Sequence, residues 1–310
     1  MYAGAKAFFY ALSRSTLLKR FASRYGLATS DSFVSRFIAG ETIEAAIDAS
    51  RRLQSQGLLV TLDHLGERMR TTEGATAATS EYVQLMDTVV DAGVERNISL
   101  KLTQIGIDVD RATCVDNLRR ILEPAAQREF FVRIDMENSP YTEQTLEIFE
   151  TLWEHQYRNL GVALQSYLHR SEADVRRMNE LGARVRLVKG AYKEPPSHAL
   201  QQKEDVDAAF VRLARMLIER GTYPAIATHD EGIIEEIRAY AAERGLAKDR
   251  FEFQMLYGIR RDLQASLAAE GHRVRVYVPF GREWFPYFMR RLGERPANVG
   301  FVMKALVRER

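Results

Sequence analysis

The chain has 310 residues, of which 46% are hydrophobic and 28% charged, a composition typical of a globular protein. The 44 Lys and Arg residues nearly balance the 42 Asp and Glu residues, so the net charge does not indicate a protein that coats nucleic acid. A single cysteine, Cys114, excludes an internal disulfide framework and any cysteine-rich metal site.

Residues 1–56 are predicted to form several helices. Gly26, Gly40 and Gly57 punctuate this segment, and its basic residues follow the short apolar stretch at the start, whereas in a signal peptide they precede it. No run in the chain approaches the roughly 18–20 apolar residues of a membrane span. We therefore interpret residues 1–56 as a helical extension packed on the domain that follows.

From residue 58 onward, short apolar runs alternate with helical stretches. The predicted strands are residues 58–62, 98–102, 130–134, 160–164, 185–188, 223–227, 251–253 and 274–278. The clearest helices are residues 110–122, which end ahead of Pro124, and then 171–181 and 205–220. Eight strands alternating with helices predict a (β/α)8 barrel over residues 57–310.

A doubly wound open sheet is the competing fold. A nucleotide-binding sheet of that kind should carry a Gly-x-Gly-x-x-Gly turn after a strand, and the chain has none. We therefore expect the barrel, with chemistry at the carboxyl ends of its strands and an interior that otherwise favours Val, Ile and Leu.

Each predicted strand carries ionisable or hydrogen-bonding side chains at or near its carboxyl end. In strand order they are Asp63, His64 and Glu67; Lys101; Asp135 and Glu137; Gln165, Ser166 and Tyr167; Arg186, Lys189 and Tyr192; Thr228, His229 and Asp230; Gln254; and Tyr277. Each alone has a structural explanation, such as an ion pair or a helix cap. Together they are better explained by one shared binding site.

The last predicted helix has a polar face. Tyr287, Arg290, Arg291 and Glu294 are spaced so that they share one side of it. That face is either solvated or suited to gripping a carboxylate through two arginines. The final segment, residues 282–310, has seven basic and three acidic residues, which fits an anionic ligand and equally fits a membrane surface.

The sequence argues against two kinds of function and leaves two others open. A metallohydrolase would need several His ligands, and only His64 and His229 are at strand ends, so we expect no metal. Nucleic-acid binding is not expected because aromatic and basic residues are not interleaved. A Schiff-base aldolase or lyase using Lys101 or Lys189 is a competitor, as is a non-catalytic barrel that binds a small carboxylate.

These residues together resemble the proline dehydrogenase family, which includes the dehydrogenase domain of proline utilization A. The segment Arg186-Leu-Val-Lys-Gly-Ala-Tyr192 is similar to the family's fifth strand, and Tyr287-x-x-Arg290-Arg291 resembles its substrate-binding helix. The resemblance extends from about residue 40 to the C-terminus. It implies a distorted barrel that binds FAD and oxidises L-proline to Δ1-pyrroline-5-carboxylate, with hydride transfer to flavin N5.

The resemblance also implies partners and a location. Electrons would pass to a membrane quinone, in the first step of proline catabolism to glutamate. We expect a cytoplasmic protein, with peripheral association at the inner face of the cell membrane as an option. The length leaves no room for an aldehyde dehydrogenase module, so a monofunctional enzyme is expected.

Residue roles follow from the same resemblance. Asp135 and Arg186 would be catalytic, and Glu67 would pair with Arg290 as a lid. Substrate would contact Lys101, Leu256, Tyr277, Tyr287, Arg290 and Arg291. FAD would contact Met136, Gln165, Arg186, Val188, Lys189, Gly190, Ala191, Thr228 and His229.

Overall fold

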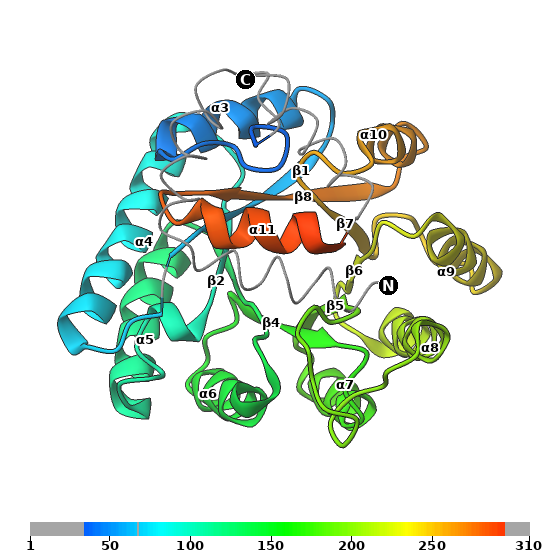
Figure 1. Ribbon diagram of the computed structural model, residues 1–310. Helices are drawn as coiled ribbons and strands as arrows, with labels where there is room; N and C mark the ends of the chain where they lie inside the picture. The colour runs from blue at the N-terminus through cyan, green and yellow to red at the C-terminus, as the bar shows by residue number, and fades with distance from the viewer. Residues whose placement is uncertain (1–33, 67, 295–310) are drawn as a thin grey trace, which may run out of the picture.

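The computed structural model describes residues 34–66 and 68–294, with side chains as far as Arg291. Eight parallel strands form a closed barrel, in the order of the sequence (Figure 1). The strands are β1 (Leu59–His64), β2 (Asn97–Leu100), β3 (Phe131–Ile134), β4 (Leu160–Gln165), β5 (Arg184–Val188), β6 (Ala225–Ala227), β7 (Glu252–Leu256) and β8 (Arg273–Phe280). The predicted (β/α)8 barrel is therefore confirmed.

Helices connect the strands and surround the barrel. They are α4 (Thr72–Ala92), α5 (Arg111–Gln127), α6 (Thr142–Glu154), α7 (Ser171–Leu181), α8 (Lys203–Arg220), α9 (Glu231–Glu243) and α10 (Arg261–Ala269), with short 3-10 turns at Leu102–Gln104 and Ser139–Tyr141. Local sequence sets their ends, because Asp110 caps α5 by accepting from Thr113 N at 2.8 Å. Gly182, with φ of 71°, ends α7.

The barrel is distorted at its two terminal helices. The first helix described, α3 (Ile43–Gln54), packs against β1 and β8, where a helix following β8 would otherwise lie. The last helix, α11 (Trp284–Glu294), instead crosses the carboxyl end of the barrel (Figure 1). Aromatic residues of α11 pack with Leu65, which follows β1, and with Tyr277 of β8. This end of the barrel is therefore covered by α11.

The predicted N-terminal extension is described only in part. Helix α3 lies within it, and its first turn is capped by Thr42, which accepts from Ala45 N at 3.3 Å. Residues 1–33, including Gly26, lie outside the described residues. Within the described part, no helix is long and apolar enough to cross a membrane.

The prediction that a helix stops ahead of Pro124 is wrong. Pro124 lies inside α5, which continues to Gln127. The proline removes one intrahelical hydrogen bond, to the carbonyl of Arg120. The buried face of the helix nevertheless continues through Leu122 and Ala125, both fully buried, and burial of this face outweighs the lost bond.

The barrel interior is more polar than expected. Outward positions such as Val274, Val276 and Val278 are fully buried against the surrounding helices. The alternate, inward positions include charged and amide side chains that are at most 4% exposed: Arg133, Arg186, Glu252, Gln254 and Arg275. The expectation of a Val, Ile and Leu interior is therefore wrong here. Arg186, Glu252, Gln254 and Arg275 hydrogen-bond to one another across the barrel, and Arg133 donates to backbone carbonyls.

The inward polar groups form connected hydrogen bonds between strands. Arg275 donates to Glu252 through Nε at 2.8 Å and through a terminal nitrogen at 3.0 Å. Gln254 donates to Glu252 and accepts from Arg186 Nε at 2.5 Å. These contacts link the floor of the barrel to the side chains at its carboxyl end.

Candidate active site

Two carboxylates and a lysine meet at the carboxyl end of the barrel, below α11. Lys101 Nζ lies 3.1 Å from Asp63 Oδ1 and 3.6 Å from Asp135 Oδ2. Tyr277 donates from its hydroxyl to Asp135 Oδ2 at 2.7 Å, and the same hydroxyl lies 3.5 Å from Lys101 Nζ. Strands β1, β3 and β8, with the residue after β2, bring these four side chains together.

Arg186 lies beneath this cluster and is fixed on several sides. It pairs with Asp135, donates to Ser99 Oγ at 2.9 Å and donates to Gln254. Its guanidinium carbon is 5.2 Å from the centroid of the Tyr277 ring. Arg186 is 4% exposed, so its charge is held in a fixed place and largely out of water.

The surroundings keep Lys101 in its charged form. Burial would lower the pKa of its ammonium group, but the carboxylates of Asp63 and Asp135 outweigh burial and raise the pKa. A Schiff-base nucleophile requires a neutral amine, and this environment disfavours one. The Tyr277 pKa is raised well above its ordinary value by burial and by Asp135 and Asp63. The cluster therefore offers a cation and a neutral phenol.

Helix α11 brings three of the predicted substrate residues to this end. Tyr287 and Tyr277 belong to one aromatic cluster. The guanidinium carbons of Arg290 and Arg291 lie 6.0 Å and 5.2 Å from the Tyr287 ring centroid. The charges of Arg290 and Lys101 both lower the pKa of Tyr192, although burial and nearby carboxylates raise it overall. Tyr192 thus links the helix to the Lys101 cluster.

Buried polar groups continue along β3, β4 and β5. Gln165 donates from Nε2 to the carbonyls of Met136 and Glu137, both at 3.2 Å, and in the parallel pairing it stands beside Val188. Its Oε1 is buried and has no hydrogen-bond partner among the described residues. Gln165 therefore has an acceptor available to a bound group.

The predicted cofactor residues after β5 form a second cluster. Lys189 Nζ lies 2.5 Å from Asp207 and 3.2 Å from Asp230. Gly190 has φ of +111°, and a Cβ there would lie 2.3 Å from the Tyr167 ring. The chain can therefore adopt this turn beside Tyr167 only with glycine. Ala191, the next residue, is exposed.

The residues at the ends of β6 and β7 lie at the same end of the barrel. Thr228 Oγ1 accepts from Asp230 N at 3.1 Å. His229 Nε2 accepts from Leu256 N at 2.9 Å, which fixes the ring against the end of β7. Leu256 itself pairs with Tyr277 in the register of β7 and β8. The structure thus brings each of these predicted residues to one end of the barrel.

One predicted pair lies partly outside the described residues, and three further residues belong to the site. Glu67, the proposed lid partner of Arg290, lies outside the described residues. Asp63, Tyr192 and Glu137 were noted only as strand-end residues. Asp63 is fully buried beside Lys101. Glu137 accepts a hydrogen bond from Thr103 Oγ1 at 2.8 Å. The sequence feature that could have identified Asp63 as a site residue is its position at the end of the first predicted strand, next to the strand that carries Lys101.

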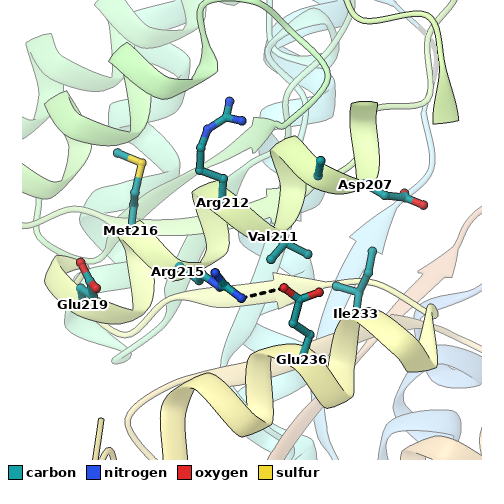
Figure 2. Close-up of a pocket in the computed structure, with 9 residues that line it drawn as sticks. Asp207, Val211, Arg212, Arg215, Met216, Glu219, Ile233 and Glu236 are labelled. Atoms are coloured by element: carbon teal, nitrogen blue, oxygen red, sulfur yellow. Dashed lines mark hydrogen bonds and ion pairs between the residues drawn. The ribbon is translucent and has the colours of Figure 1, made fainter. Parts of the chain in front are cut away.

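Two surface hollows in the described part of the protein lie away from this end. One lies between α8 and α9 and is shown in Figure 2, where Arg215 pairs with Glu236 across it. The other lies at the amino end of the barrel. The polar cluster under α11 is identified by its chemistry, not by the volume of a hollow.

Comparisons with known proteins agree with this geometry. A family model described as "Proline dehydrogenase" matches residues 46–304. "Proline dehydrogenase 2" of Bacillus subtilis is 40% identical over 97% of this chain and 98% of its own length, and "Proline dehydrogenase" of Deinococcus radiodurans is 42% identical over 88% of this chain and 89% of its own length.

A solved structure extends the comparison to the fold. Proline utilization A from Bdellovibrio bacteriovorus, inactivated by N-propargylglycine, superposes with a TM-score of 0.78 at 27% sequence identity. The match covers 84% of this chain and 32% of that protein. This chain therefore corresponds to about a third of that larger protein.

Proposed function

The chain belongs to the proline dehydrogenase family, and we propose that it catalyses the FAD-dependent oxidation of L-proline to Δ1-pyrroline-5-carboxylate, the first step of proline catabolism to glutamate. Electrons would pass to a membrane quinone. The observation that carries the proposal is the cluster under α11, where Lys101 is held as a cation beside Asp135 and Tyr277.

The cluster fits a small zwitterion. Proline has little apolar surface, so its carboxylate must supply much of the affinity. Arg290 and Arg291 on α11, with Lys101 below, provide three cationic groups for that carboxylate. Tyr277 and Tyr287 share an aromatic cluster that suits a five-membered ring. Leu256, which pairs in register with Tyr277, would add apolar contact to that ring.

The residues of β4, β5 and β6 fit a flavin. The buried Gln165 Oε1 has an acceptor position that the described protein groups do not use. Gly190 lets the backbone after β5 lie against the Tyr167 ring, which a Cβ would prevent, and we propose that this turn contacts the cofactor. Lys189 and Thr228 supply a cation and a hydroxyl suited to the ribityl and phosphate groups. Met136, Val188, Ala191 and His229 complete the set that we propose contacts the cofactor.

FAD, when bound, supplies the hydride acceptor. The protein groups would position proline and set the local charge. Asp135 fixes Arg186 and Tyr277 by accepting from both. The fixed charge of Arg186 favours the electron-rich, reduced form of the cofactor. The aromatic residues of α11 cover this end of the barrel and exclude water from it.

The wider arrangement belongs to the same proposal. We infer a helical segment over residues 1–56 and a catalytic barrel over residues 57–310. A quinone acceptor resides in the membrane, so peripheral association with the cytoplasmic face would bring the two together. The pairing of Glu67 with Arg290 as a lid remains a prediction.

The test measures the product and the acceptor directly. Purified holoenzyme is incubated with L-proline and either a dye or a short-chain quinone, and Δ1-pyrroline-5-carboxylate is trapped with o-aminobenzaldehyde. The proposal predicts adduct formation and quinone reduction in equal amounts. Absence of the adduct with both acceptors would overturn the activity, and adduct with the dye alone would overturn the quinone assignment.

A further inference from the structure

The amino end of the barrel, opposite the candidate active site, is hollowed. The hollow has a volume of about 760 Å³ and lies among the segments that precede β1, β2 and β3. Its lining includes Glu95, Arg96, Phe131, Arg184 and Arg275. In barrel enzymes this end serves stability rather than catalysis, so a charged hollow here calls for its own explanation.

Arg184 lines this hollow between two aromatic rings. Its guanidinium carbon lies 4.2 Å from the centroid of the Phe131 ring and 4.5 Å from that of Tyr223. Both distances are within the range of a cation–π contact, and neither ring takes up the N–H donors of Arg184. Its Nε is buried and has no hydrogen-bond partner among the described residues.

The tyrosine of this stack is held in a strained backbone conformation. Tyr223 has φ of +46°, a left-handed value that costs a bulky residue about 1–3 kcal/mol. The conformation places its hydroxyl 3.1 Å from Glu252 and its ring against Arg184. The surrounding contacts thus fix the ring that orients the Arg184 guanidinium.

The charges around the hollow do not balance. Arg275 pairs with Glu95 and Glu252, and Arg96 pairs with Glu129 at 3.0 Å. Arg184 in the lining, and Arg133, which does not line the hollow, have no carboxylate within 4.0 Å among the described residues. Arg133 is 2% exposed, and its terminal nitrogen donates only to the backbone carbonyls of Arg184 and Val162.

The charged residues that line the hollow are therefore three arginines, Arg96, Arg184 and Arg275, and two glutamates, Glu95 and Glu129. Burial, and then the charges of Arg186 and Arg184, lower the pKa of Arg133. Burial is the largest cause that lowers the pKa of Arg184; Arg275 lowers it further, while Glu252 and Glu95 raise it. An anion beside Arg184 would offset part of the cost of burying its charge, because opposite charges nearby stabilise the ionised form.

We propose that the amino end of the barrel binds one oxyanion of the phosphate type, held by the in-plane donors of Arg184. A guanidinium fork matches the geometry of two phosphate oxygens. The volume of the hollow exceeds that of a single phosphate ion, so it also accommodates the organic part of a small phosphomonoester. The site is separate from the proposed proline site and does not depend on that activity.

The test is calorimetric titration of the holoenzyme with inorganic phosphate and with glycerol 3-phosphate, at constant ionic strength in potassium chloride. One saturable site per chain is expected. Arg184→Gln should weaken binding at least tenfold, because a hydrogen bond to a charged group contributes about 1.5–3 kcal/mol. Arg184→Lys keeps the charge but loses the fork, and should fall in between. The control is Arg176→Gln on the surface of α7, where the arginine is 65% exposed; it should bind as the wild type does.

Proline oxidation should be unchanged in all three variants, because Arg184 and Arg176 are not at the carboxyl end. Tighter binding of glycerol 3-phosphate than of phosphate would identify a monoester as the ligand, and equal binding would identify the free ion. Absence of saturable binding to wild type would overturn the proposal. So would unchanged binding by Arg184→Gln and Arg184→Lys, or equal displacement by chloride.

Discussion

The ion pair between Glu252 and Arg275 makes the sharpest stability prediction. Both side chains are buried, with 1% and 4% of their residue surface exposed. Glu252 receives two hydrogen bonds from Arg275 at 2.8 and 3.0 Å and one from the Tyr223 hydroxyl at 3.1 Å. Glu252→Gln removes the charge while nearly keeping the shape. Removing one partner of a buried pair destabilises a protein by about 3–5 kcal/mol when the other charge is left uncompensated, and since Arg275 keeps Glu95 as a second partner, we expect a loss at the lower end of that range.

An exposed pair provides the control. Arg215 and Glu236, drawn in Figure 2, lie 2.7 Å apart with side chains 43% and 46% exposed. An exposed pair contributes only about 0–1 kcal/mol, because water and salt screen it. Urea unfolding at pH 7 should therefore show a large loss of unfolding free energy for Glu252→Gln and almost none for Glu236→Gln.

The pH dependence of the unfolding free energy provides a second test of the same pair. Burial alone would raise the pKa of Glu252, but Arg275 outweighs burial and lowers the pKa to about 2. A carboxylate with a lowered pKa adds stability that is fully present above its ordinary pKa of 4.5 and is lost as the pH falls toward 2. The difference between wild type and Glu252→Gln should shrink over that range. A loss below about 1 kcal/mol at pH 7, equal to that of Glu236→Gln, would refute the reasoning.

Three further predictions concern the candidate site. Arg290→Ala should raise the proline KM about 10- to 100-fold in steady-state kinetics, since a charge-assisted bond contributes about 1.5–3 kcal/mol, and should leave the flavin content unchanged. A variant that lost flavin but kept the wild-type KM would contradict the assignment of Arg290 to substrate binding. Gln165→Leu should raise the flavin dissociation constant several-fold, measured by flavin fluorescence on dilution, and equal retention by wild type and variant would contradict it. Gly190→Ala should also weaken flavin retention, because its Cβ would meet the Tyr167 ring; a normal flavin content in the purified variant would count against this assignment.

The barrel itself could be predicted because its signal is local. Eight short apolar runs separated by helical stretches are visible in the sequence, and seven of the observed strands overlap the predicted ones in at least three residues, with β7 shifted toward Leu256. The end of α5 was wrong because the burial of Ala125, which outweighs the local effect of Pro124, depends on tertiary packing.

The polar interior could not be predicted in the same way. Arg133, Arg184 and Arg275 each alternate with apolar residues along a strand, which by itself fits a solvent-facing position. Only barrel closure turns these positions inward, and only the register places Glu252 beside Arg273 and within reach of Arg275. Such pairs join residues far apart in the sequence, so local patterns do not identify them.

The sequence predicted most residues of the candidate site but not all of the contacts between them. Strand-end position and family resemblance named Lys101, Asp135, Arg186 and Tyr277, and the structure brings these four into direct contact. The role of Asp63 as the nearest partner of Lys101 appeared only in the structure, because it depends on β1 and β2 being neighbours in the barrel.

The most direct measurement is the absorption spectrum of the purified protein under anaerobic conditions, before and after addition of L-proline. The proposed function predicts flavin bands that bleach when L-proline is added and that return when a quinone is supplied. A protein that takes up no FAD, or whose flavin bands are unchanged by L-proline, would contradict it.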